Sequence, residues 1–232
     1  FQVLALEIDG KSQRSWDSEE RELWYYAAKN VTRELLPGSL NVYFGKDGYG
    51  RILCLLESEE SVEKLREHLK ICADRITTFA SRHFPFSLTA GLGSGGKGIS
   101  NIARSCHQAV FSLENNYVQE GKYVMDYEET KSSVSRNTFL NSDRRSRILI
   151  CLRQGDQQSL EKLLLDVFRD ARLYKISYDM LQCHCTEFIF LCLEYMEETD
   201  IPLEEIFMQI DSPLDMLEGI RNIDEAEQEI LG

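Results

Sequence analysis

Two carboxylates are the first residues of this chain that could do chemistry. Glu7 and Asp9 stand two apart at the end of the apolar stretch "FQVLALEID", which predicts a strand. Carboxylates at a strand end can coordinate Mg²⁺ and, through it, the phosphates of a nucleotide. Acidic residues also form turns after strands, so the pair alone leaves a metal site and a turn both open.

A glycine-rich loop is the second candidate. In "GLGSGGKGIS", Gly91, Gly93 and Gly96 have the G-x-G-x-x-G spacing between a predicted strand and a predicted helix. The backbone N–H groups of such a loop can bind a phosphate. Lys97 stands where a P-loop has its lysine, but Gly98 replaces the Ser or Thr that would hold Mg²⁺. Because the loop follows a hairpin, we expect a flexible glycine turn, with nucleotide binding as the alternative.

A third group, Cys183, His184 and Cys185, has ligands that zinc prefers. Three consecutive residues of a helix point in three directions, and no second pair of ligands stands nearby. We therefore expect no metal here and no cofactor elsewhere. Cys185 and Cys192 lie seven apart in an apolar stripe, as residues of a helical core do.

The stretch "FGKDGYGRILCLL" predicts a tight hairpin between two strands. A turn of this kind needs positive φ angles, which we expect from its small and turn-forming residues, Gly45, Asp47, Gly48 and Gly50.

These residues belong to a predicted α+β unit. Periodicity predicts helices at about 15–36, 59–83 and 99–117, and strands at 1–9, 39–45, 51–57, 86–93 and 122–127. Hairpin and crossover connections both occur, which predicts a mixed sheet flanked by helices. The seam of the second helix fits a helix lying on a sheet or, as an alternative, a coiled coil; it comprises Val62, Leu65, Leu69, Cys72, Ile76 and Phe79.

The remainder of the chain is predicted to be all helical. The polar "TKSSVSRNT" indicates a linker, so we expect an α/β domain at 1–130, a linker at 131–142 and a helical domain at 143–232. Asp156 is predicted as the N-cap of an amphipathic helix. A helix centred on "FIFLCL" is apolar nearly all round, which predicts burial among other helices, and Pro202 and Pro213 indicate the starts of short acidic helices.

Composition excludes several classes of function. The formal net charge of −13 disfavours direct binding to nucleic acid or to an anionic membrane. Seven scattered cysteines and apolar runs too short to span a bilayer indicate a cytoplasmic protein with reduced thiols. Because the chain starts at Phe1, we expect a piece of a longer protein.

The element order, the "ALEIDG" strand, the "GYGRILCLL" hairpin and the segment from "FSLTAGLGSGGKGIS" to "KYVMDY" together resemble a GGDEF domain, the diguanylate cyclase fold. The degenerate GGDEF-like domains of AraC-type bacterial transcription and response regulators are the most similar. There a "GLG" strand end precedes a helix with a Ser-x-x-x-Ala pattern, here Ser105 and Ala109. The helical segment with "LRQGDQQSLEKLLLDVF" is similar to the spacer before the helix-turn-helix of such regulators.

The resemblance also implies that the chemistry is lost. The family's Gly-Gly-Asp-Glu-Phe signature aligns with Gly48, Tyr49, Gly50, Arg51 and Ile52, so the metal-binding acid becomes a glycine and its neighbour an arginine. Glu7 and Asp9 match the family's Asp-x-Asp, but the Phe-Lys that follows it in the family is absent. Two Mg²⁺ ions and a triphosphate need several carboxylates.

We therefore expect a non-catalytic, homodimeric regulatory module of a two-component or related regulator, which reaches DNA through a helix-turn-helix domain outside this chain. One alternative is a small-molecule or nucleotide sensor, with Glu7, Asp9, Arg51 and Lys97 as the candidate ligand-binding residues. An active diguanylate cyclase is the remote alternative.

Overall fold

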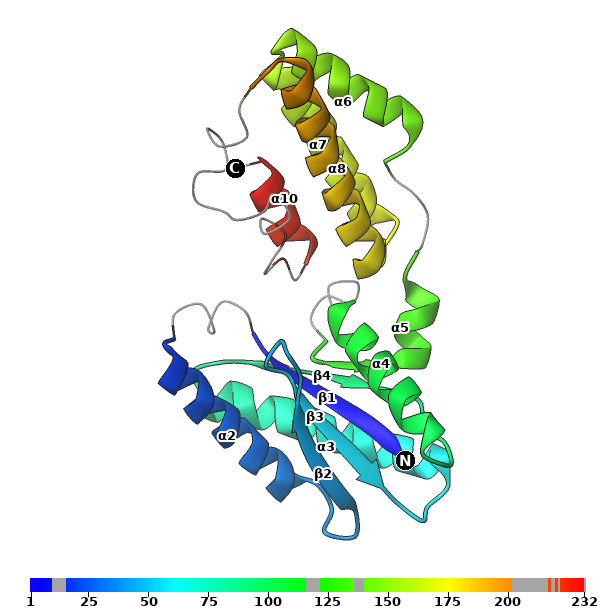
Figure 1. Ribbon diagram of the computed structural model, residues 1–232. Coiled ribbons are helices and arrows are strands. Elements are labelled where there is room, and N and C mark those ends of the chain that lie inside the picture. The colour runs from blue at the N-terminus through cyan, green and yellow to red at the C-terminus, as the bar shows by residue number, and fades with distance from the viewer. Residues whose placement is uncertain are drawn as a thin grey trace. The chain divides into compact units, whose positions relative to one another are not determined.

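The computed structural model describes residues 1–9, 16–115, 122–135, 140–201, 217, 220 and 222–231 (Figure 1). The chain divides into two compact units, Phe1–Ser133 and Val134–Gly232, each of which is described by itself.

The first unit is built on a mixed five-stranded sheet with the strand order β2-β3-β1-β4-β5. All neighbouring strands are antiparallel except β4 and β5, which are parallel, so the predicted mixed sheet is confirmed. The strands are β1 (Gln2–Ile8), β2 (Asn41–Lys46), β3 (Ile52–Glu57), β4 (Leu88–Leu92) and β5 (Val124–Asp126).

Helices cover both faces of this sheet. The helices α2 (Ser18–Leu35) and α3 (Val62–His83) pack on the face to which Leu4 and Leu6 of β1 point. The alternate residues of β1 point to the opposite face, where Val3 and Ala5 meet α4 (Ser100–Glu114) (Figure 1). The seam of α3 is thus buried on the sheet, as predicted, instead of forming a coiled coil.

Local sequence explains where α2 and α3 begin and end. Asp17 caps α2 in a reciprocal capping box with Glu20, and the helix ends at Leu35, just before Leu36 and Pro37. The helix α3 begins at Val62, three residues later than predicted, because the Ser61 side chain accepts a hydrogen bond from the Lys64 N–H and sets the N-cap.

The second unit is helical, as predicted. Its helices among the described residues are α6 (Ser142–Gln154), α7 (Gln157–Leu173), α8 (Tyr178–Glu198) and α10 (Ile223–Leu231). Asp156 is the N-cap of α7, as its position predicts, and its carboxylate accepts from the Ser159 N–H at 3.0 Å. Of the described residues between 131 and 142, the first belong to the end of α5 (Tyr127–Ser133), Ser135 forms an isolated bridge to Ile176, and Ser142 begins α6. The prolines Pro202 and Pro213 lie outside the described residues.

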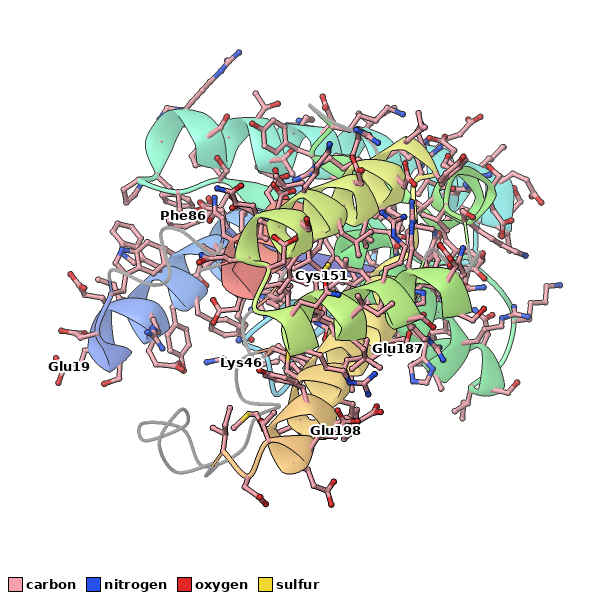
Figure 2. All side chains as sticks on the ribbon, turned by 90° about the horizontal axis from the view of Figure 1, so that it is seen from above. Glu19, Lys46, Phe86, Cys151, Glu187 and Glu198 are labelled. Carbon is pink, nitrogen blue, oxygen red and sulfur yellow. The ribbon has the colours of Figure 1, made fainter. Side chains whose placement is uncertain are left out.

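Arginines join the helices of this unit to one another. Arg145 and Arg153 of α6 pair with Glu187 and Glu198 of α8. Figure 2 labels these two glutamates on α8. The prediction that α8 is buried all round its centre is wrong in one place, because 57% of Phe190 is exposed. Among the described residues, no helix is long and apolar enough to cross a membrane.

Candidate functional site

The hairpin turn between β2 and β3 is held by one side chain. The Asp47 carboxylate accepts hydrogen bonds from the backbone N–H groups of Tyr49 and Arg51, both at 2.9 Å. Gly50 has a φ of +81° and is the one hairpin residue in the left-handed region. The expectation of positive φ at Gly45, Asp47 and Gly48 is wrong, because the Asp47 side chain closes the turn instead.

Arg51 follows this turn and is buried, with 4% of its side chain exposed. Its guanidinium meets three carboxylates from three parts of the fold. The nitrogen Nε lies 3.3 Å from Glu7 of β1, Nη2 lies 3.1 Å from Glu114 of α4, and Nη1 lies 3.7 Å from Asp47. The Arg51 guanidinium therefore lies at the point where these three carboxylates converge.

The charge of Arg51 is stabilised by these neighbours. Burial alone would lower the pKa of the guanidinium, but the charges of Glu7 and Glu114 outweigh burial and hold the pKa above its ordinary value. The Tyr49 ring also lies against the guanidinium, with 5.1 Å between Cζ and the ring centroid. The guanidinium thereby offsets part of the negative charge of the cluster without an added ion.

The candidate ligand-binding residues are not brought together as one site. Glu7 and Arg51 are in contact, but Asp9 turns to the segment before β4, where its carboxylate accepts from the Ser87 N–H at 2.8 Å. Lys97 lies on the loop after β4, which is antiparallel to β1, so this loop lies at the opposite end of β1 from Glu7. Hydrogen bonds from Gly93 N–H to Val3 and from Gly96 N–H to Phe1 place the loop there.

The glycines of the G-x-G-x-x-G stretch serve helix packing. A Cβ on Gly91 would lie 2.2 Å from the Ala109 carbonyl oxygen, and one on Gly93 would lie 2.0 Å from that of Ser105. The Ser-x-x-x-Ala pattern of α4 thus lies directly on Gly91 of β4 and on Gly93, which follows the strand. The N–H groups of Gly93, Ser94 and Gly96 already donate to protein acceptors, so they do not form a phosphate cradle.

The Cys183, His184 and Cys185 side chains diverge, as their spacing predicts. Cys183 is exposed, Cys185 is buried, and His184 is buried with Nδ1 3.0 Å from the Glu187 carboxylate. Burial raises the pKa of Cys185 to about 12, which disfavours the thiolate that zinc needs. Among the described residues, no three or more His, Cys, Asp or Glu side chains form a group that could hold a metal ion. All seven cysteines are described, and each is a free thiol.

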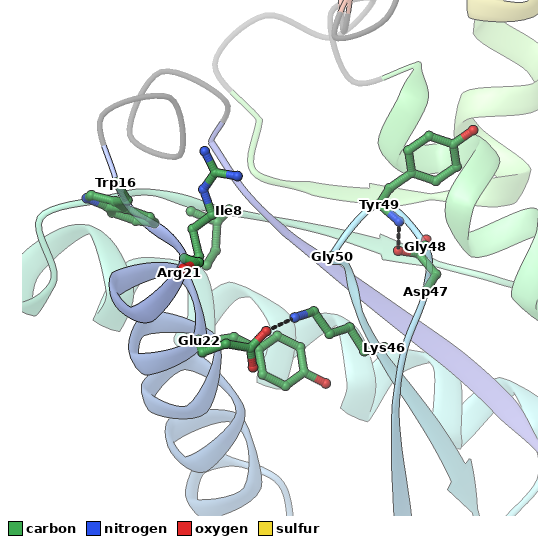
Figure 3. Close-up of a pocket in the computed structure, with 11 residues that line it drawn as sticks. Ile8, Trp16, Arg21, Glu22, Lys46, Asp47, Gly48, Tyr49 and Gly50 are labelled. Carbon is green, nitrogen blue, oxygen red and sulfur yellow. Dashed lines mark hydrogen bonds and ion pairs between the residues drawn. The ribbon is translucent and has the colours of Figure 1, made fainter.

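A pocket of about 370 Å³ lies beside the turn between β2 and β3, and it was not predicted from the sequence (Figure 3). Its walls come from the end of β1, the first turns of α2 and the turn between β2 and β3. The lining residues are Ile8, Trp16, Ser18, Arg21, Glu22, Tyr25, Lys46, Asp47, Gly48, Tyr49 and Gly50. The sequence signal was weak, because the polar members are ordinary exposed residues of a helix and a turn, and none of them forms a motif.

The chain was compared with protein-family models, with curated proteins and with solved structures, and none of the three comparisons finds a match.

Proposed function

We propose that this chain is a non-catalytic regulatory and dimerisation module, which relays a signal to a helix-turn-helix domain outside the chain, as in AraC-type bacterial transcription regulators. The resemblance of the sequence to degenerate GGDEF-like domains suggests this role. The α+β fold of the first unit, followed by a helical unit, agrees with it at the level of fold class alone.

One observation supports the non-catalytic part of the proposal. The guanidinium of Arg51 lies among the carboxylates of Glu7, Asp47 and Glu114 and is paired with all three, so it takes the position that a divalent cation bound by these acids would need. A metal ion entering this cluster would meet a buried positive charge, whose repulsion is strong at short range in a partly desolvated site. Metal-assisted phosphoryl or nucleotidyl transfer is therefore disfavoured here.

Net charge supports the assignment of DNA contact to another domain. With 39 acidic and 26 basic residues, the chain repels a polyanion on approach. Several arginines of the helical unit are also engaged with carboxylates, as in the pairs Arg153–Glu198 and Arg172–Asp224. Dimerisation is proposed because paired DNA half-sites are read by two-fold symmetric proteins.

Three measurements on the purified chain test this function. We expect no cyclic di-GMP from GTP with Mg²⁺ or Mn²⁺, self-association in sedimentation velocity as the protein concentration rises, and no gel shift of DNA at low salt. Product that disappears in a Glu7→Ala variant would contradict the non-catalytic role. A strictly monomeric species at high concentration would contradict the dimer, and tight DNA binding would overturn the assignment of that role to another domain.

The pocket beside the hairpin favours a second candidate function, the sensing of a small molecule. Its volume of about 370 Å³ falls within the range of metabolite-binding pockets. The residues expected to bind the ligand are not the ones that line it, since Glu7, Asp9, Arg51 and Lys97 are all absent from its walls. A sensing function would therefore use a different set of residues from those with which the family holds metal and nucleotide.

A further inference from the structure

The charges that line the pocket beside the hairpin can be balanced pair by pair. Lys46 forms an ion pair with Glu22, and its ammonium group also lies 4.7 Å from the centroid of the Tyr25 ring. Asp47 is engaged by two backbone N–H groups and by Arg51. Among the described residues of the lining, these contacts leave one further charged side chain, that of Arg21.

Arg21 is the cation that a ligand would meet. Among the residues that the structure describes, no carboxylate forms an ion pair with it, and it lies on the exposed face of α2. Figure 3 shows its side chain extending between Trp16 and the hairpin turn. A guanidinium presents paired N–H donors in one plane, which match the two oxygens of a carboxylate. One cation without a carboxylate partner, among the described lining residues, suits a ligand with a single negative charge.

Aromatic side chains form the wall beside this cation. The Trp16 ring is held in place by Phe86, at 5.5 Å between centroids, and by Trp24, at 6.1 Å. Tyr25 lines the same pocket and donates a hydrogen bond from its hydroxyl to the Gly45 carbonyl at 3.3 Å. A fixed indole ring favours a flat, apolar ligand that can lie against it.

We propose that this pocket binds a planar aromatic monocarboxylate, with the carboxylate on Arg21 and the ring system against Trp16. A nucleoside triphosphate fits less well, because among the described lining residues its several negative charges would meet one cation without a carboxylate partner, beside the acids Glu22 and Asp47, which are already paired. The inference rests on the second candidate function, that of a sensor, and it assigns the ligand class to that function.

Two-dimensional ¹⁵N–¹H spectra test the proposal directly, because the chain has two tryptophans, Trp16 and Trp24. Their indole N–H signals are assigned with a Trp16→Phe variant, and the probe is 2-naphthoate, a flat monocarboxylate. We expect a saturable shift of the Trp16 signal. The neutral 2-naphthalenemethanol and the ring-free acetate should each bind at least tenfold more weakly, since each lacks one of the two recognised groups.

Matched arginine variants separate the pocket from a general charge effect. Arg21→Gln should weaken 2-naphthoate binding roughly tenfold, as expected for the loss of a charged hydrogen bond at a partly exposed site. Arg75→Gln, on the exposed side of α3 and outside the pocket, should leave it unchanged. The dispersed signals of both tryptophans serve as the check that each variant is folded.

The outcomes are distinct. The proposal is overturned if 2-naphthoate, up to its solubility limit, does not shift the Trp16 signal. It is also overturned if the Arg21→Gln variant binds 2-naphthoate as tightly as the unmodified chain does and the unmodified chain binds 2-naphthalenemethanol as tightly as 2-naphthoate. Sedimentation of the same samples addresses the sensing function separately. Binding that leaves self-association unaltered would support the ligand site and contradict its use as a sensor.

Discussion

Ser105 of α4 and Gly93, the residue after β4, meet backbone to backbone. The Ser105 carbonyl oxygen lies 2.0 Å from the position that a Cβ of residue 93 would take, and the Ser105 hydroxyl accepts a hydrogen bond from the Val3 N–H at 2.9 Å. The helix is thereby fixed to β1 and β4 at a separation that leaves no room for a side chain at position 93.

Gly93→Ala tests this contact. The added methyl group would lie 2.0 Å from the Ser105 carbonyl oxygen, and backbone must move to admit it. We expect the free energy of unfolding to fall by about 3 kcal/mol in urea denaturation, at the upper end for overpacked sites. Gly38→Ala is the control, because its Cβ would meet nothing within 4 Å, and it should change stability by less than about 0.5 kcal/mol. Equal effects of the two substitutions would refute the packing role.

Arg51→Met should destabilise the first unit by roughly 3 kcal/mol at pH 7, because it removes the partner of three partly buried carboxylates. In the variant, Glu7 and Glu114 repel each other, so protonation relieves the strain. The loss in the free energy of unfolding, relative to the unmodified chain, should therefore become smaller as the pH falls from 7 to about 4. Thermal unfolding across that range measures it, and a deficit that is independent of pH would argue against the charge cluster.

Asp126 provides a second dependence on pH. Burial alone would raise the pKa of its carboxyl, but hydrogen bonds from Arg66 and the charge of Lys70 outweigh burial and hold the pKa below its ordinary value. A lowered folded-state pKa stabilises the fold above the unfolded pKa. This contribution should be complete above about pH 5 and lost as the pH falls below about 4.

Asp126→Asn isolates that contribution. We expect a loss of about 2 kcal/mol at pH 7, because the half-buried Arg66 is left facing a buried amide, and a much smaller loss near pH 3. Glu129→Gln is the matched control, since Glu129 also pairs with Lys70 but is exposed, and it should cost less than about 1 kcal/mol. Urea denaturation at both pH values gives the comparison.

Metal analysis tests the Cys183, His184 and Cys185 stretch. Protein purified without chelators should contain no stoichiometric zinc, because the three side chains point apart and Cys185 is buried as a protonated thiol. Near-stoichiometric zinc that is lost in Cys185→Ser would show that this reasoning is wrong.

Periodicity and capping predicted most of the fold. The apolar run of β1 and the Asp156 cap depend on neighbouring residues, so a single sequence contains them. Whether the candidate ligand-binding residues come together depends on strand direction, which local sequence does not reveal. Since β4 runs antiparallel to β1, Lys97 lies at the opposite end of β1 from Glu7. The partners of Arg51 were also missed in part, because Glu114 is 63 residues away and looks like any helix-surface acid.

The buried contacts of Arg51 bear on how this protein can vary over evolutionary time. A substitution at position 7 or 114 strips the guanidinium of a counter-charge, while one at position 51 leaves acids facing one another. Each of these substitutions alone destabilises the fold, so a change at one of these positions is tolerated only together with a compensating change at another. In an alignment of homologues, positions 7, 51 and 114 should accordingly change together or not at all.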